Sequence, residues 1–277
     1  MKYRNSFFTV LCLSVCLLSC KQNNTAEFDS VAIGSGVEQT SGEFDKAGAS
    51  RSNLDLAPTS TTKQIIQHTY YSLSYNEEYE QAEWVAYELK KENLKNNDFK
   101  RPYFIEDNKV STGSADWRNY KKSGYDKGHL VPAADMELNL DSYNDTFLTS
   151  NISPQDHEFN AGIWNRLEQK VRFWAEKYNG VYVVTGGVLE PSLQTIGKDH
   201  VAVPKEFYKI ILYPSGSNYK MIAFLIPNKA SNKALFDYAV PVDVIEKKTG
   251  IDFFPALDDA IENKLEKEVD KHPWFIR

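Results

Sequence analysis

The stretch SGYDKGHLVPAAD, from Ser123 to Asp135, is the part of the chain from which the fold is best predicted. SNISPQ follows it at Ser150–Gln155, and FNAGIWNRLE at Phe159–Glu168. This short span offers a base, a cation, two carboxamides and a carboxylate, which are the parts needed for metal-assisted hydrolysis. We expect it to fold as a strand, a loop and a helix around one ion.

The first block predicts an extended segment that ends at a histidine. Tyr125 to Leu130 is expected to form a strand or an extended loop that presents His129. Gly128 stands directly before the histidine and lets the backbone approach a neighbour closely there. Asp126 is expected to brace the turn.

The third block begins a predicted helix from Asn160 to Tyr178, because apolar residues recur there at three- and four-residue spacing. Asn179-Gly180 is the expected stop. Asn160, Trp164 and Glu168 fall at i, i+4 and i+8, so they lie along one side, with the first and last alpha carbons about 12 Å apart. Asn160 and Glu168 could then address one metal ion and its waters, whereas Trp164 is expected in the core.

The rest of the chain reads as a sheet with flanking helices. Aromatic and alternating apolar residues predict strands at Tyr70–Asn76, Glu83–Leu89, Gly180–Leu189, Val201–Tyr213 and Tyr219–Asn228. A last helix is expected from Ala256 to Val269. With 277 residues, of which 42% are hydrophobic and 13% aromatic, the chain can bury a full core. We predict an α+β fold with a mixed central sheet flanked by helices.

The N-terminus carries an export signal. Lys2 and Arg4 precede the apolar run FFTVLCLSVCLL, which is too short to span a bilayer comfortably. Leu17-Leu18-Ser19-Cys20 then resembles a bacterial lipobox, in which the cysteine is lipidated and the preceding residues are removed. A plain secretory signal with a chance cysteine is the alternative.

These features predict three parts: a lipoprotein signal peptide at 1–19, a flexible tether at 20–62 and a folded domain at 63–277. The tether is rich in Ser, Thr, Asn, Gly and Ala and has no sustained apolar period. Cys20 would anchor the exported protein to a membrane, facing the periplasm or the cell surface. Cys12 and Cys16 would leave with the signal, so we expect no disulfide in the mature domain.

The three blocks together resemble the DNA/RNA non-specific endonuclease family, which has a ββα-metal catalytic core. The family hallmark, Asp-Arg-Gly-His followed by Pro-Ala, is matched by Asp126, Lys127, Gly128, His129, Pro132 and Ala133. The second block is matched by Ser150, Asn151, Pro154 and Gln155, and the third by Asn160, Trp164, Leu167 and Glu168. Three blocks in this order are a specific signal, whereas DKGH alone would be weak.

The resemblance implies a role for each polar residue. His129, whose imidazole is ordinarily largely neutral at pH 7, would be the general base that takes a proton from the attacking water. Asn160 would be the sole direct side-chain ligand of Mg²⁺, with Mn²⁺ as a substitute, and Glu168 would orient metal-bound water. Asn151 would help to hold the metal-water cluster or the phosphate, and Lys127 would meet the phosphate.

The implied activity is metal-dependent hydrolysis of phosphodiester bonds in DNA and/or RNA with little sequence preference. The family resemblance also suggests a homodimer. The formal net charge of −6 is opposite to the usual basic footprint, so a local basic groove must carry the binding. The candidates are Lys100, Arg101, Lys109, Arg118, Lys121, Lys122 and Lys127. Ordinary solvated surface charge is the alternative for all of them except Lys127.

Two rival hypotheses stay open. One is a lipid-anchored nucleic-acid-binding module on the same fold whose catalysis has decayed: the acidic charge and Lys127, which replaces the usual arginine fork by a point charge, favour it. The intact His129, Asn160 and Glu168 argue against it. The other rival is a zinc hydrolase using His129 and His157, which lacks short-spaced ligand pairs.

Three smaller points qualify the resemblance. Asn151 could be only a turn residue. Asn160 could also cap the helix, a role compatible with metal binding. Ala161 stands where the third block of the family commonly has glutamine.

Overall fold

The computed structural model describes residues 56–215 and 218–275. The predicted signal peptide, the predicted lipidation site Cys20 and the tether as far as residue 55 lie outside these residues. Within the described ranges, no helix combines the length and the apolar character needed to cross a bilayer.

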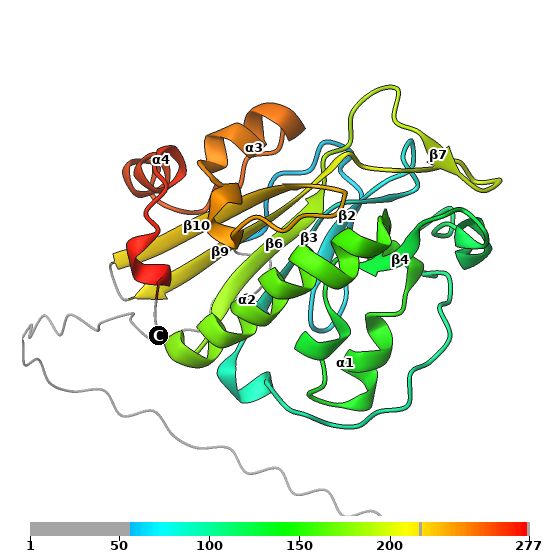
Figure 1. The fold of residues 1–277 in the computed structure, drawn as a ribbon, viewed down its shortest axis with the longest axis horizontal. Coiled ribbons are helices and arrows are strands. Elements are labelled where there is room, and N and C mark those ends of the chain that lie inside the picture. Colours follow the sequence, from blue (N-terminus) through cyan, green and yellow to red (C-terminus); the bar gives the residue numbers. More distant parts are fainter. Residues whose placement is uncertain (1–55, 216–217, 276–277) are drawn as a thin grey trace, which may run out of the picture. The chain divides into compact units, whose positions relative to one another are not determined.

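A seven-stranded sheet forms the centre of the domain, in the order β1-β2-β3-β6-β9-β10-β11 (Figure 1). The strands are β1 Ile65–Gln67, β2 Ser72–Asn76, β3 Gln81–Leu89, β6 Val181–Gly187, β9 Glu206–Ser215, β10 Asn218–Pro227 and β11 Ala239–Val240. The α+β class is confirmed. All neighbouring strands of this sheet are antiparallel, whereas we expected a mixed sheet. For β1–β2 and β2–β3 the reason is that short connections join the strands, whereas parallel neighbours need long crossovers.

The predicted strand Val201–Tyr213 is divided in two. Val201–Ala202 forms β8, which pairs with β7, Thr195–Ile196, in a separate two-stranded ribbon. The long strand β9 begins only at Glu206. Pro204 lies between the two pieces, where a residue without an N–H group interrupts the hydrogen bonding of a sheet.

Different helices cover the two faces of the sheet (Figure 1). α2, Asn165–Tyr178, belongs to one core cluster, with Trp174 fully buried. α3, Val242–Thr249, and α4, Asp259–Lys267, lie with the second cluster on the other face. Burying each large apolar side chain contributes about 1.5–3 kcal/mol. The side chains of β9 alternate between these clusters, so Lys209, between Phe207 and Ile211, faces the α2 side.

The segment between β3 and β6 holds the predicted functional blocks. It contains β4 Asp126–His129, α1 Leu140–Asp145, β5 Ile152–Gln155 and a π-helical turn at Phe159–Trp164 that leads into α2. β4 and β5 form their own antiparallel hairpin. Short 3₁₀ turns complete the described chain, at Lys91–Asn93, Trp117–Tyr120, Ala133–Asp135, Thr149–Asn151, Leu235–Tyr238 and His272–Trp274.

The predicted continuous helix from Asn160 to Tyr178 is wrong in its first turns. Gly162 has a non-helical backbone (φ −97°, ψ −107°) inside the π-helical turn, and regular α-helix begins at Asn165. The i, i+8 relation of Asn160 and Glu168 along one straight helix therefore does not hold. The predicted end is confirmed, since Asn179 adopts the left-handed conformation of a helix stop.

The C-terminal end of the predicted tether, 20–62, is wrong. Residues 56–62 contact the domain: Leu56 is buried in the second core cluster, and the backbone carbonyl of Thr59 accepts a hydrogen bond of 2.8 Å from the Trp84 indole. The backbone N–H and side-chain hydroxyl of Thr61 both donate to the carboxylate of Glu83, which is buried in the sheet. A buried carboxylate needs such donors, and the folded domain therefore includes Leu56–Thr62.

Candidate active site

The β4–β5 hairpin closes because Gly128 has no side chain. β4 and β5 pair so that His129 lies opposite Ile152. A Cβ atom on Gly128 would collide with the side chain of Gln155, which is fully buried. The close approach predicted at this glycine is therefore confirmed, and it sets the position of His129 at the end of β4.

Asp126 joins the hairpin to the π-helical turn. Its Oδ2 atom accepts a hydrogen bond of 3.0 Å from Asn160 Nδ2 and lies 2.9 Å from His157 Nδ1. A carboxylate can only accept, so the amide of Asn160 must turn its NH₂ group toward Asp126 and its Oδ1 atom away. Among the described residues no hydrogen bond reaches that Oδ1, which leaves an oxygen donor of the type that Mg²⁺ prefers. The residues present therefore fit a divalent cation on Asn160.

His157 is the exposed member of this group. Its side chain is 70% exposed, and its hydrogen bond to Asp126 raises its pKa above the ordinary value. Protonated, it adds a positive charge beside the carboxylate. The pair it forms with Asp126 is the structural histidine–aspartate contact that is common in proteins.

His129 is half-buried and is held in its neutral form. Burial, and then the charge of Arg101, lower its pKa from 6.5 to about 3. Its ring stands edge-on to Phe147, with 5.0 Å between centroids, and lies 5.6 Å from Phe104. Nε2 is enclosed and has no hydrogen-bond partner, so Nδ1 is the nitrogen through which the half-buried ring can meet a water molecule. A neutral imidazole with one free nitrogen can accept a proton.

Two cations surround the same aromatic side chains. Lys127 Nζ lies 5.3 Å from the Phe104 ring centroid. The Arg101 guanidinium lies 5.6 Å from Phe104 and 5.3 Å from Phe147. Alternation along β4 places Lys127 and His129 on one face of the hairpin. Two of the seven predicted groove cations are therefore placed beside the histidine.

The other groove candidates either contact residues outside the site or are simply exposed. Arg118 forms an ion pair with Asp116, and Lys109 Nζ donates to the backbone carbonyl of Gln67. Lys121 and Lys122 are exposed in a turn before β4, and Lys100 is exposed beside Arg101 in the chain. These five residues retain the interpretation as ordinary surface charge.

Asn151 holds the backbone that directly follows His129. It is fully buried, its Oδ1 accepts from the backbone N–H of Val131, and its Nδ2 donates to the carbonyls of Val131 and Thr146. Its backbone carbonyl also accepts from the N–H of Leu130, the residue after His129. Both N–H groups of the carboxamide are thus used by backbone, which makes Asn151 a positioning residue. The predicted contact with metal-bound water or phosphate has no support in these contacts.

Glu168 lies within a group of partly and fully buried charges on the α2 side of the sheet. Burial raises its pKa, and the nearby Lys209 opposes that rise. Burial lowers the pKa of Lys209, and Glu168 opposes that fall in turn. Asp135 and Arg172 complete the group through an ion pair of 2.7 Å. Among the described residues, no direct hydrogen bond joins Glu168 to Asn160, so any link between them must run through solvent or a cation.

Lys209 connects the two segments that carry the candidate base and metal ligand. It is fully buried, its Nζ lies 3.4 Å from the carbonyl oxygen of Leu130, and it stands 4.8 Å above the ring of Trp164. Leu130 follows His129, and Trp164 belongs to the same π-helical turn as Asn160. A buried ammonium ion needs such compensation, and removing it would leave Glu168 and Asp135 with Arg172 alone.

Several of these residues are not predicted by the sequence pattern. Lys209 had a usable signal, because it is the one cation on an inward-facing position of the apolar run EFYKIILY. Asp135 and Arg172 had none, and the zinc hypothesis named His157 without its partner Asp126, since these partners come from distant parts of the chain. The zinc alternative gains no support: in the described ranges the one cluster of three potential metal-binding side chains contains neither His129 nor His157.

The chain is similar to a known protein family and to several of its members. The family model described as DNA/RNA non-specific endonuclease matches residues 51–260. Nuclease C1 of Cunninghamella echinulata var. echinulata is 34% identical over 226 residues, which are 76% of this chain and 90% of that protein. Human mitochondrial endonuclease G is 34% identical over 69% of this chain and 70% of its own length.

Two further matches extend the comparison. The mitochondrial nuclease EXOG of Danio rerio is 37% identical over 69% of this chain, but the match spans only 60% of that protein. A solved structure, the crystal structure of an EndoG/EndoGI complex, superimposes with a TM-score of 0.66 at 30% identity. That likeness covers 70% of this chain and 87% of the solved chain.

Proposed function

This chain belongs to the DNA/RNA non-specific endonuclease family, and from that premise we propose that it hydrolyses phosphodiester bonds of DNA and/or RNA with little sequence preference. The observation that carries the proposal is the neutral, half-buried His129 beside the Phe104 ring, which Arg101 and Lys127 also approach. A neutral base flanked by cations suits a reaction in which a water loses a proton beside an anionic phosphate.

His129 is the proposed general base. Nδ1 accepts the proton of the attacking water, because Nε2 is enclosed. The low pKa keeps this nitrogen unprotonated at neutral pH, before any substrate has bound. Lys127 and Arg101 hold the phosphate backbone by charge alone, which is recognition without base readout.

Asn160 is the proposed metal-binding side chain, with its Oδ1 presented by Asp126. Members of this family depend on a divalent metal, and we propose Mg²⁺, with Mn²⁺ as a substitute. When bound, the cation supplies positive charge that stabilises the negative charge developing on the phosphate. Glu168 would orient water bound to the cation, and Lys209 and Arg172 limit the cost of its charge.

The test is conversion of supercoiled plasmid by the purified chain with Mg²⁺ and with a chelator, beside His129→Ala. The matched control is His272→Ala, which removes an exposed histidine from the far end of the chain. We expect Mg²⁺-dependent nicking by the wild type and the control, and loss of nicking in His129→Ala. Plasmid binding without cleavage under any divalent metal would favour the decayed binding module instead.

We also propose that the protein is an exported lipoprotein anchored through Cys20, facing the periplasm or the cell surface. The support is the lipobox-like Leu17-Leu18-Ser19-Cys20 after a short apolar run. Cys20→Ala should abolish labelling of the protein by a fatty acid supplied to the cells. A mutant that is labelled like the wild type would contradict the anchor. The homodimer raised by the family resemblance stays a prediction.

A further inference from the structure

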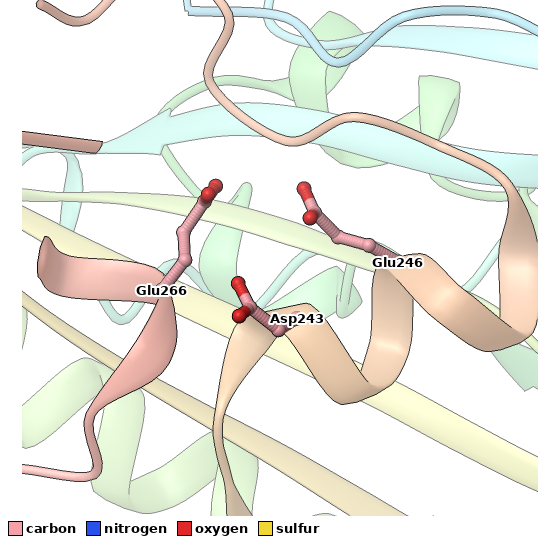
Figure 2. Close-up of side chains that lie close together, drawn as sticks. All are labelled: Asp243, Glu246 and Glu266. Carbon is pink, nitrogen blue, oxygen red and sulfur yellow. The ribbon is translucent and has the colours of Figure 1, made fainter. Parts of the chain in front are cut away.

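A cluster of carboxylates lies far from the candidate active site, on the opposite face of the sheet. Asp243 and Glu246 belong to α3, and Glu266 belongs to α4. One ligand oxygen from each of the three lies within 4.8 Å of the other two. Figure 2 shows the Glu266 side chain reaching from α4 toward the gap that it shares with Glu246 and Asp243.

Glu266 points to a ligand independently of the clustering. Its residue is only 6% exposed, and its Oε1 atom is buried with no hydrogen-bond partner. It stands in the last turn of α4, where the helix dipole disfavours a negative charge. A buried carboxylate oxygen without a donor is costly, and a bound cation or a proton is needed to offset that cost.

Among the described residues, the compensation is limited to a side-chain hydrogen bond between Glu246 and Glu266, which needs a proton on one of the two carboxyl groups. Asp252 and Glu262 add further negative charge, and Glu262 also has a buried oxygen without a partner. Lys247 and Lys267 line the same hollow, yet among the described residues neither forms an ion pair with a member of the cluster. The hydrogen bond that Glu246 accepts comes from the backbone N–H of Phe253.

We propose that Asp243, Glu246 and Glu266 bind a calcium ion that joins α3 to α4. Three carboxylates are hard oxygen ligands, and the hollow beside them, about 560 Å³, leaves room for water to complete the coordination. Two oxygens on Ca²⁺ can lie up to about 5 Å apart at its bond lengths, so the observed separations need no large movement. Mg²⁺ requires shorter bonds and near-octahedral geometry, so two of its oxygens can lie no more than about 4.2 Å apart.

The expected consequence is structural. α3 and α4 cover the second core cluster. The bound cation would attract the carboxylates of both helices, which otherwise repel one another. This site is independent of the nuclease proposal, because none of its residues belongs to the hairpin or to the π-helical turn.

The experiment is a calcium titration of the purified full chain carrying Asn160→Ala, followed by calorimetry and by thermal unfolding. Asn160→Ala removes the proposed active-site ligand. The heat of calcium binding and the rise in unfolding temperature therefore report on the α3–α4 site. We expect one bound Ca²⁺ per chain and an unfolding temperature that rises with calcium up to about 10 mM, a range typical of weak extracellular sites.

Glu266→Gln, which keeps the shape and removes the charge, should abolish both effects, and Asp243→Asn serves as a second variant if the first fails to fold. Asp259→Asn removes the same charge from an exposed position of α4 and should leave binding unchanged. An unfolding temperature indifferent to calcium would overturn the proposal and indicate that Glu246 and Glu266 share a proton. Equal binding by Glu266→Gln would overturn it as well.

Discussion

Asp126→Ala tests whether the hairpin orients the proposed metal ligand. The substitution removes the carboxylate that holds Asn160 Nδ2 at 3.0 Å and leaves the β4–β5 backbone pairing intact. The Asn160 amide is then free to rotate, and its Oδ1 is presented to the cation for only part of the time. We expect weaker metal binding, with the proposed base His129 untouched.

The magnitude follows from that one hydrogen bond. Hydrogen bonds to charged groups contribute about 1.5–3 kcal/mol, and the 35% exposure of the Asp126 side chain argues for the lower end. Since about 1.4 kcal/mol is tenfold in an equilibrium constant, the metal affinity should fall about 10- to 30-fold. This agrees with the usual effect of removing a partner of a metal ligand.

The assay is plasmid nicking as a function of Mg²⁺ concentration. We expect the half-saturating Mg²⁺ concentration to rise about 10- to 30-fold, with the rate at saturating Mg²⁺ close to wild type. His157→Ala is the matched control, because it removes the other partner of Asp126, whose contact is exposed and should change affinity no more than about fivefold. An unchanged half-saturating concentration in Asp126→Ala, or a larger effect in His157→Ala, would refute the reasoning.

Three further predictions concern the groups around the hairpin. Because the pKa of His129 falls from 6.5 to about 3 on folding, the unfolded chain binds an extra proton between these values, so the free energy of unfolding should decrease as the pH drops through this window. Denaturant unfolding at pH 4.5 and pH 7 should show a smaller decrease in His129→Gln, and identical decreases would count against the low pKa. Gly128→Ala should destabilise the protein by about 1–3 kcal/mol through its collision with Gln155, and adding Gln155→Ala should restore part of that loss; strictly additive effects would mean that the two positions do not touch. Lys209→Met should lower the free energy of unfolding in urea by about 3–5 kcal/mol, because Glu168 loses its compensating charge. The loss should be smaller in the Lys209→Met/Glu168→Gln double mutant.

The sequence pattern predicted the structure correctly where a single residue or a short segment carries the signal. The strand that presents His129 and the close approach at Gly128 are both confirmed. So are the buried Trp164 and the helix stop at Asn179. In each case one residue type is the signal: a missing side chain, an apolar residue at helical spacing or a left-handed turn residue.

Pattern failed where the outcome depended on packing between distant segments. Periodicity predicted an unbroken helix from Asn160, yet the backbone leaves the helical conformation at Gly162. Composition assigned Thr61 to a tether, although its hydroxyl is a partner of the buried Glu83. Such departures are expected at functional sites and at the edges of domains, because tertiary contacts override weak local preferences there.

The sequence by itself determined the family and the α+β class, because three short blocks in a set order are specific even before folding. The roles that it assigns to His129, Asn160 and Glu168 stay predictions. The tertiary structure alone decided how those residues are held. Asp126 turns the amide of Asn160, burial keeps His129 neutral, and Lys209 compensates Glu168 from a distant strand. The physical reason is that hydrogen bonding, desolvation and buried charge depend on distances across space, which spacing along the chain does not encode.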